Sequence, residues 1–307
     1  MVELKREELM KNRGYGALLS DALSLLSRNF KKIARHIWMF AVVYCAVTAY
    51  AVMRSIHLAR TDVLADAGST TEACTVLVLM LMTGVAFWSR AAMLLNGQTM
   101  RYNLIKTLKL LVFGLIVAVI IFAVTTGLSW LTFFILHKSG TDLDFMQSAT
   151  VIYLILLCVM TVAVFVLLPY SYVMMKYIME PGTRLRKTVF GGYRSGLRHY
   201  GYIFITMLLL WIISCVVATV LSMPMLVLVI ALGIAVGGTV IGDPLELPGY
   251  FYPMMYIVTF LTNIITAVVS LFQIFVIYYM YGSIEKRTEE KAGMMSKSKD
   301  KQNDYQP

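Results

Sequence analysis

Six long apolar stretches, separated by short segments of alternating charge, constrain this chain more than any other feature. Hydrophobic residues make up 59% of its 307 residues and charged residues only 14%, whereas a soluble domain carries about 25% charged residues. If the stretches are membrane spans, 24 of the 27 Lys and Arg residues fall in alternate segments, starting with the N-terminal one. Only 3 fall in the segments between them. This positive-inside bias predicts a chain that crosses a membrane six times with both termini in the cytoplasm.

The apolar stretches predict an all-α, polytopic integral membrane protein with a single membrane domain over residues 17–282. A cytoplasmic N-terminal segment, residues 1–16, precedes it. A cytoplasmic tail, residues 283–307, follows it, and the Lys, Glu and Ser content of this tail predicts disorder. The six transmembrane helices are predicted at about residues 37–53, 73–88, 110–136, 149–175, 202–222 and 253–281.

Residues 225–238, which follow Pro224, are predicted as a half-span. Their 14 residues are too few for a complete crossing, which needs about 20. A complete crossing would also place the lysine-rich tail outside, against the charge bias. One G-x-x-x-G, formed by Gly233 and Gly237, could let this segment pack closely on a neighbouring helix or a second copy.

Three cytoplasmic segments have the pattern of basic amphipathic helices that lie in the membrane interface. Residues 17–36 lead into the first span, with an apolar stripe of Leu19, Leu23, Leu26, Phe30, Ile33 and Ile37. Residues 96–109 place Met100, Leu104 and Leu108 on one side, away from Asn103, Lys106 and Lys109. Residues 184–199 follow a possible N-cap at Thr183 and are weakened by Gly191, Gly192 and Gly196. Whether these segments are true repeats stays open.

Basic residues of the first and third amphipathic segments are the candidate lipid-headgroup-binding residues. Nucleic-acid binding is disfavoured, because the charge is spread over short juxtamembrane segments and not gathered on one soluble domain. Anionic membrane lipids are the expected partners, and each basic residue near an anionic surface contributes about 1 kcal/mol. The candidates are Arg28, Lys31, Lys32, Arg35, Arg186, Lys187, Arg194 and Arg198.

The last span carries a polar face formed by Thr262, Thr266, Ser270 and Gln273. Spacings of three and four residues place them on one side of a helix. They could line a substrate path, or they could pack against a neighbouring helix through small residues and interhelical hydrogen bonds. The pattern favours packing.

Enzyme chemistry has little support. The four histidines divide equally between the two predicted sides, and the four cysteines show no metal-binding spacing. No nucleotide-binding or hydrolase motif is found, so no metal, cofactor or catalytic residue is expected. On the predicted outer side, Asp142 and Asp144 form only a short D-x-D, which is typical of a solvated turn.

Two stretches resemble a group of bacterial multi-span proteins. The first is SDALSLLSRNFKKIARHIWMFAVVY, and the second begins YSYVMMKYIMEPGTRLRKTVFGGYRSGLRHYGY. Each has a basic helix with Ser or Gly before an aromatic entry to a span. The chain is similar to the membrane domain of some glycerophosphodiester phosphodiesterases and to related stand-alone proteins. No segment here could hold their catalytic barrel, so the resemblance implies a multi-span fold without phosphodiesterase activity.

The sequence therefore predicts a non-enzymatic, multi-pass protein of the bacterial inner (cytoplasmic) membrane with a lipid-engaging or scaffold role. A membrane-protein partner or homo-oligomer is compatible with this role. The alternative is a transporter or channel-like permease subunit that uses the polar face of the last span. A membrane-embedded enzyme that acts on lipids is a third, less supported hypothesis.

Overall fold

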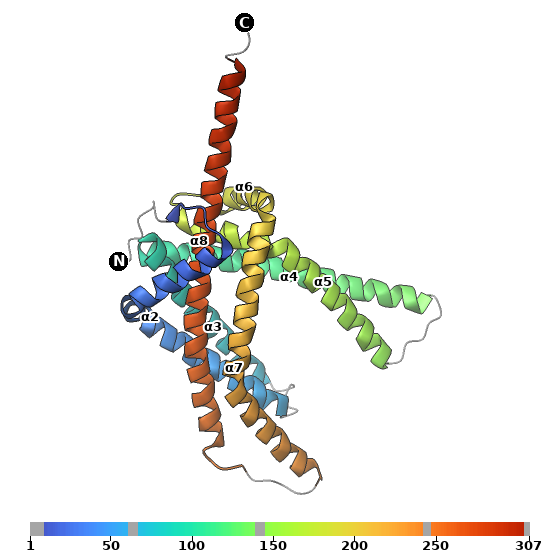
Figure 1. Ribbon diagram of the computed structural model, residues 1–307. Helices are drawn as coiled ribbons and strands as arrows, with labels where there is room; N and C mark the ends of the chain where they lie inside the picture. The colour runs from blue at the N-terminus through green and yellow to red at the C-terminus, as the bar shows by residue number, and fades with distance from the viewer. Residues whose placement is uncertain (1–8, 61–66, 139–144, 242–246, 304–307) are drawn as a thin grey trace. The chain divides into compact units, whose positions relative to one another are not determined.

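The computed structural model describes residues 9–60, 67–138, 145–241 and 247–303. These residues form seven α-helices and no β-strand (Figure 1). Six of the helices, all except α6, are long and apolar enough to cross a membrane. The all-α fold class and the six transmembrane helices are thus confirmed. The helices are α2 (Tyr15–Arg60), α3 (Ala67–Asn96), α4 (Met100–Lys138), α5 (Phe145–Met179), α6 (Leu185–Arg198), α7 (Tyr200–Ile241) and α8 (Phe251–Asn303).

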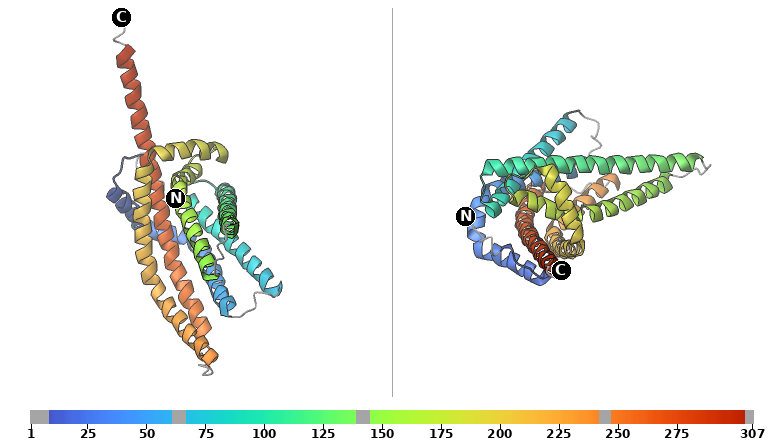
Figure 2. Two further views of the ribbon diagram at one scale, coloured as in Figure 1. Left: turned by 90° about the vertical axis from the view of Figure 1, so that its right-hand side faces the viewer. Right: turned by 90° about the horizontal axis from the view of Figure 1, so that it is seen from above.

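The chain divides into two compact units, where the sequence predicts one membrane domain. The first unit comprises residues 1–104 and 205–307 and contains α2, α3, α8 and most of α7. The second unit, residues 105–204, contains most of α4, all of α5 and α6, and the first residues of α7. The long α8 of the first unit and the α4–α5 hairpin of the second can be followed in Figure 2.

In the first unit α2 packs against both α3 and α8. Tyr44 of α2 stacks on Phe87 of α3, with ring centroids 5.5 Å apart. Farther along the same two helices, the hydroxyl of Tyr50 donates a hydrogen bond to Glu72 (2.7 Å), and Glu72 also pairs with Arg54. The α2–α3 pair is therefore held by an aromatic contact and by an ion pair.

Residues 225–238, predicted as a half-span, form no separate helix in the structure, because α7 continues through Pro224 without a break. A proline inside a helix removes one backbone hydrogen bond, and membrane helices tolerate this when their neighbours hold both halves. Residues after Pro224 are held in this way by a core cluster shared with the start of α8. The cluster consists of Leu228, Leu232, Phe251 and Met255. Residues 225–238 therefore belong to the same helix as the preceding span.

The predicted disorder of the tail is also corrected over residues 283–303, and residues 304–307 lie outside the described residues. Ser283 and Ile284 are completely buried, and α8 continues as a helix to Asn303. The Lys, Glu, Ala and Met residues that follow are good helix formers. An ion pair between Lys286 and Glu289 (3.8 Å) lies on this segment. The composition that predicts disorder therefore also suits a helix that is already nucleated by a packed span.

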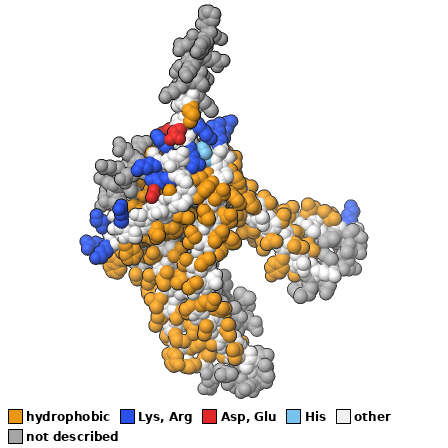
Figure 3. All heavy atoms as spheres, viewed as in Figure 1, with side chains coloured by type: hydrophobic (Ala, Val, Ile, Leu, Met, Phe, Trp, Pro, Cys, Tyr) orange, Lys and Arg blue, Asp and Glu red, His pale blue; other side chains and the backbone are white. Residues whose placement is uncertain are grey.

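The surface of the long helices is apolar over most of their length. In Figure 3 hydrophobic side chains cover most of the visible surface of the long helices. In the most apolar part of α5 none of the residues is buried within the chain, and in that of α4 only 6% are. Such helices suit a lipid environment, because lipid tails are as apolar as these side chains.

Candidate functional site

Helix α6 carries four of the candidate headgroup-binding residues and follows a tight turn. Gly182 in this turn has a φ of +78°, a left-handed conformation that favours glycine. The N-cap residue of α6 is Arg184, in an extended conformation. The predicted N-cap, Thr183, instead donates its hydroxyl hydrogen to the carbonyl oxygen of Glu180 (3.1 Å). The prediction of the N-cap was therefore wrong by one residue.

The face of α6 that contacts α5 is built from small residues. Thr188, Gly192 and Gly196 are buried at spacings of four, so they form one line along the helix. A Cβ at Gly196 would lie 3.0 Å from the Cβ of Pro169, and one at Gly192 would lie 3.3 Å from Val173. The sequence predicts that glycines weaken α6. In the structure two of them allow its close contact with α5.

The contact between α5 and α6 lies at a proline inside α5. Pro169 has no N–H, so the carbonyl oxygen of Phe165, four residues earlier, loses its partner within the helix. The hydroxyl of Tyr200 donates to this oxygen (3.2 Å), and the hydroxyl of Tyr193 donates to the next one, that of Val166 (2.9 Å). Both bonds give these carbonyl oxygens a partner at the proline. The bond from Tyr193 also fixes the rotation of α6 against α5, whereas Tyr200 is the first residue of α7.

The opposite side of α6 carries its basic face, defined as Arg186, Lys187, Arg194 and Arg198. All four side chains are exposed. None of them forms an ion pair or side-chain hydrogen bond with another residue of the described ranges. Because the glycine face fixes the rotation of the helix, these four positive charges point away from α5.

The first amphipathic segment has a similar division of faces. In the structure it is continuous with the first span, and both belong to α2. Of its predicted apolar stripe, Leu23 and Phe30 are exposed, whereas Leu26, Ile33 and Ile37 are buried. The basic face of α2, defined as Arg28, Lys31, Lys32 and Arg35, is exposed. The structure thus places all eight candidate basic residues at the surface, on two helices.

The burial of Lys106 is not expected from the sequence, in which this residue lies away from the apolar side of the second amphipathic segment. Lys106 is only 5% exposed, and its ammonium group donates to the carbonyl oxygens of Tyr177 and Glu180, the latter at 2.7 Å. These carbonyls belong to the C-terminal end of α5, where a positive charge is favourable. Leu104 and Leu108, which form the predicted apolar side, are exposed instead.

The second amphipathic segment therefore turns its polar side inward. Asn103 is completely buried, and Asn96 donates to its side-chain oxygen at 2.7 Å. The spacing of Asn103, Lys106 and Leu110, all buried, defines one helical face. This spacing of three and four residues is visible in the sequence, and it was the available sign that Lys106 shares a helical face with Leu110.

Arg13 is a second buried basic residue that the sequence analysis missed. It is 6% exposed, its Nε donates to Asp21 (2.8 Å), and its guanidinium lies 4.5 Å from the ring centroid of Tyr279. Its backbone N–H donates to the hydroxyl of Ser283 (2.9 Å), and Arg287 donates to its carbonyl oxygen (3.0 Å). The segment before α2 is thereby anchored on α8.

The predicted polar face of α8 is largely occupied by hydrogen bonds. The hydroxyls of Thr266 and Ser270 each donate to the carbonyl oxygen four residues earlier (both 2.9 Å). Gln273 donates to the hydroxyl of Ser214 on α7 at 2.6 Å. Beside this face, Asn263 donates to Thr48 on α2 (3.0 Å). The two bonds that join α8 to other helices, those of Gln273 and Asn263, favour helix packing over a substrate path.

Cysteine labelling tests this interpretation. In a cysteine-free background, Thr262→Cys, Thr266→Cys, Ser270→Cys and Gln273→Cys are expected to resist a membrane-impermeant maleimide applied from either side. Helix contacts exclude water at Gln273, and lipid excludes it at the exposed Thr266. Ser55→Cys, at an exposed position near the end of α2, serves as the labelled control. Rapid labelling at the mid-membrane positions would instead establish a water-filled path and revive the transporter alternative.

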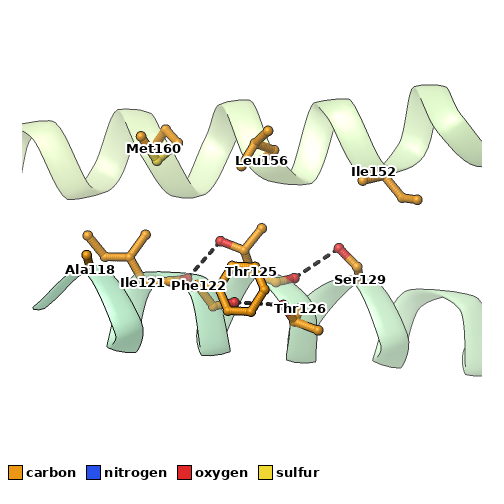
Figure 4. Close-up of a pocket in the computed structure, with 9 residues that line it drawn as sticks. All are labelled: Ala118, Ile121, Phe122, Thr125, Thr126, Ser129, Ile152, Leu156 and Met160. Atoms are coloured by element: carbon orange, nitrogen blue, oxygen red, sulfur yellow. Dashed lines mark hydrogen bonds between the residues drawn. The ribbon is translucent and has the colours of Figure 1, made fainter. Parts of the chain in front are cut away.

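A groove of about 550 Å³ lies between α4 and α5 (Figure 4). Its lining is apolar apart from three hydroxyl-bearing residues of α4. Thr125, Thr126 and Ser129 each donate to a carbonyl oxygen of their own helix, at 2.8, 2.8 and 2.9 Å. The groove therefore presents no converging polar groups that could act on a substrate.

The histidines and acidic residues of the described ranges form no group of three or more that could hold a metal ion. Asp142 and Asp144, the D-x-D of the lipid-enzyme hypothesis, lie outside the described residues. Comparisons of the chain with models of known protein families, with curated proteins and with solved structures give no match. The exposed surface of the helices is therefore the remaining candidate for a functional site.

Proposed function

We propose that this chain is a non-enzymatic, multi-pass protein of the cytoplasmic membrane that binds anionic lipid through the basic faces of α2 and α6. The proposal is carried by a difference between two groups of basic residues, one buried and bonded within the fold and the other exposed. Arg13 and Lys106 are buried and hydrogen-bonded within the fold. The eight residues of the two basic faces are exposed and form no side-chain bond with another described residue. Eight cations that no described acidic side chain neutralises, beside apolar spans, suit an anionic surface.

The charge distribution along the chain supports the proposed orientation. Both basic faces belong to segments on the side that is rich in Lys and Arg, which the positive-inside rule assigns to the cytoplasm. The cytoplasmic leaflet is the one that carries negative surface potential. Lipid phosphates there can accept charge-assisted hydrogen bonds from Arg and Lys, which are stronger than hydrogen bonds between neutral groups.

Stabilisation by lipid tests the proposal. Addition of phosphatidylglycerol to the purified protein in neutral detergent is expected to raise the midpoint of thermal unfolding, because a ligand that binds only the folded state stabilises it. Replacing the basic face of α6 by glutamine should weaken the apparent affinity at least about tenfold at low salt, since each charge contributes about 1 kcal/mol. The fourfold variant of the α2 basic face should behave in the same way.

Two controls make the result specific. A variant that exchanges Arg for Lys and Lys for Arg at the same four positions of α6 keeps the charge and should keep most of the affinity. Phosphatidylcholine should have a much smaller effect than phosphatidylglycerol on the wild-type protein. If the glutamine variants respond to phosphatidylglycerol as the wild type does, the proposed function is wrong.

A further inference from the structure

The exposed face of α6 also carries two large apolar residues. Phe190 is 72% exposed and Leu197 is 48% exposed. They are seven positions apart, which is about two helical turns, so they lie on one line along the helix. We infer that α6 inserts Phe190 and Leu197 between membrane lipids, below the level of the phosphate groups. The inference rests on the proposed lipid function and specifies how α6 docks.

The apolar pair lies within the basic face of α6. Arg186 and Lys187 precede Phe190 by four and three positions, and Arg194 follows it by four, so all three are its neighbours on the helix surface. Arg194 is also three positions before Leu197. Long basic side chains can extend their charged ends to phosphates while their aliphatic parts lie along apolar groups. This arrangement matches the headgroup boundary of an anionic membrane.

Rotation of α6 cannot bury the two apolar side chains in the protein. The opposite face of α6 is held against α5 by the close contact of Gly196 with Pro169. The contact is so close that a Cβ at position 196 would lie only 3.0 Å from the Cβ of Pro169. The hydrogen bond from Tyr193 to Val166 fixes the same rotation. Phe190 therefore faces outward because of the packing of α6, and a lipid surface gives it an apolar environment.

Helix α2, in the other unit, also exposes an apolar pair. Leu23 is 58% exposed and Phe30 is 49% exposed, again seven positions apart. The basic residues of α2 lie on a different side of the helix, because Arg28 and Lys31 are two and one positions from Phe30 and residues so spaced do not face each other. Of these two helices, only α6 surrounds its apolar pair with basic residues, so the inference of insertion is made for α6.

Fluorescence of a probe at position 190 tests the inference. The environment-sensitive dye NBD is attached to Phe190→Cys in a cysteine-free background, and the protein is placed in nanodiscs. Lys291→Cys, on the exposed polar end of α8, is the aqueous reference, and Val119→Cys, at an exposed apolar position of α4, is the reference within the bilayer. We expect the probe at 190 to be blue-shifted and its quenching by iodide to be at least about threefold weaker than at 291.

Depth and lipid charge separate the possible outcomes. Stronger quenching at 190 by a spin label near the top of the acyl chains than by one near their ends supports shallow insertion. If the probe at 190 behaves like that at 291 while phosphatidylglycerol still stabilises the protein, insertion is overturned and the proposed function stands. If the probe inserts equally in neutral and anionic nanodiscs and phosphatidylglycerol has no special effect, insertion stands and the proposed anionic preference fails.

A photocrosslinking measurement keeps the test independent of cysteine removal. The photoreactive residue benzoylphenylalanine replaces Phe190 in the natural sequence, a change that disturbs no internal packing because the side chain is exposed. Adducts with the mass of a phospholipid are expected at position 190 and not at position 291. Adducts with protein alone would overturn insertion and identify a protein surface as the partner of α6.

Discussion

Replacing Gly196 by alanine is expected to destabilise the second unit by about 1–3 kcal/mol, the usual consequence of adding a group to a filled contact. The new Cβ would lie 3.0 Å from the Cβ of Pro169 and 3.4 Å from its carbonyl oxygen. Neither atom can move without displacing the backbone of α5. The midpoint of thermal unfolding should fall by several degrees, measured by the intrinsic fluorescence of the purified protein.

The same helix contains a matched control for this variant. A Cβ at Gly191 would have nothing within 4 Å. Gly191→Ala should therefore stabilise α6 by up to about 1 kcal/mol, through the better helix propensity of alanine. Gly192→Ala, with a Cβ 3.3 Å from a methyl group of Val173, should fall between the two. Equal responses at positions 191 and 196 would show that the glycine face does not hold α6 on α5.

Lys106→Met is expected to destabilise the second unit by about 3 kcal/mol or more. The substitution leaves the carbonyl oxygens of Tyr177 and Glu180 without the ammonium donor, in a place where Lys106 itself is 5% exposed. Hydrogen bonds that involve a charged group contribute about 1.5–3 kcal/mol each, and buried groups left unpaired add a desolvation penalty. Thermal unfolding and proteolysis of the turn around Gly182 measure the effect.

The neighbouring Lys109 provides the control. It lies one helical turn after Lys106 and is exposed. Lys109→Met removes the same charge, and its effect on stability should remain within about 0.5 kcal/mol, as for most surface substitutions. If both variants unfold at the same temperature, Lys106 acts only as one of the many positive charges of the predicted cytoplasmic side.

The long apolar stretches made the number and type of the main elements predictable. A run of about 20 apolar residues has few alternatives to a transmembrane helix, so six such helices could be expected from the sequence alone. The positions at which the helices end were harder to predict. Pro224 and the composition after residue 283 both suggest an interruption, yet α7 and α8 continue through them. Residues after Pro224 pack in a core cluster, and Ser283 and Ile284 are buried.

The basic residues of the candidate site could be predicted from the sequence, but the contacts that orient its helices could not. The eight basic residues could be chosen from their position beside spans, and all are exposed. The inward positions of Arg13 and Lys106 were missed, since their sequence neighbourhoods resemble those of the exposed cations. The role of Gly196 was missed as well, because it depends on Pro169, which lies 27 residues away along the chain.

The sequence by itself determined that the chain is an all-helical membrane protein and which residues carry its surplus charge. Only the tertiary structure decided which side of each helix faces the protein. In water an apolar stripe marks the buried side of a helix, because solvent exposure of that stripe is unfavourable. In a membrane the lipid is as apolar as the protein interior, so Leu104 can face outward while Lys106 is buried on the carbonyl groups of α5.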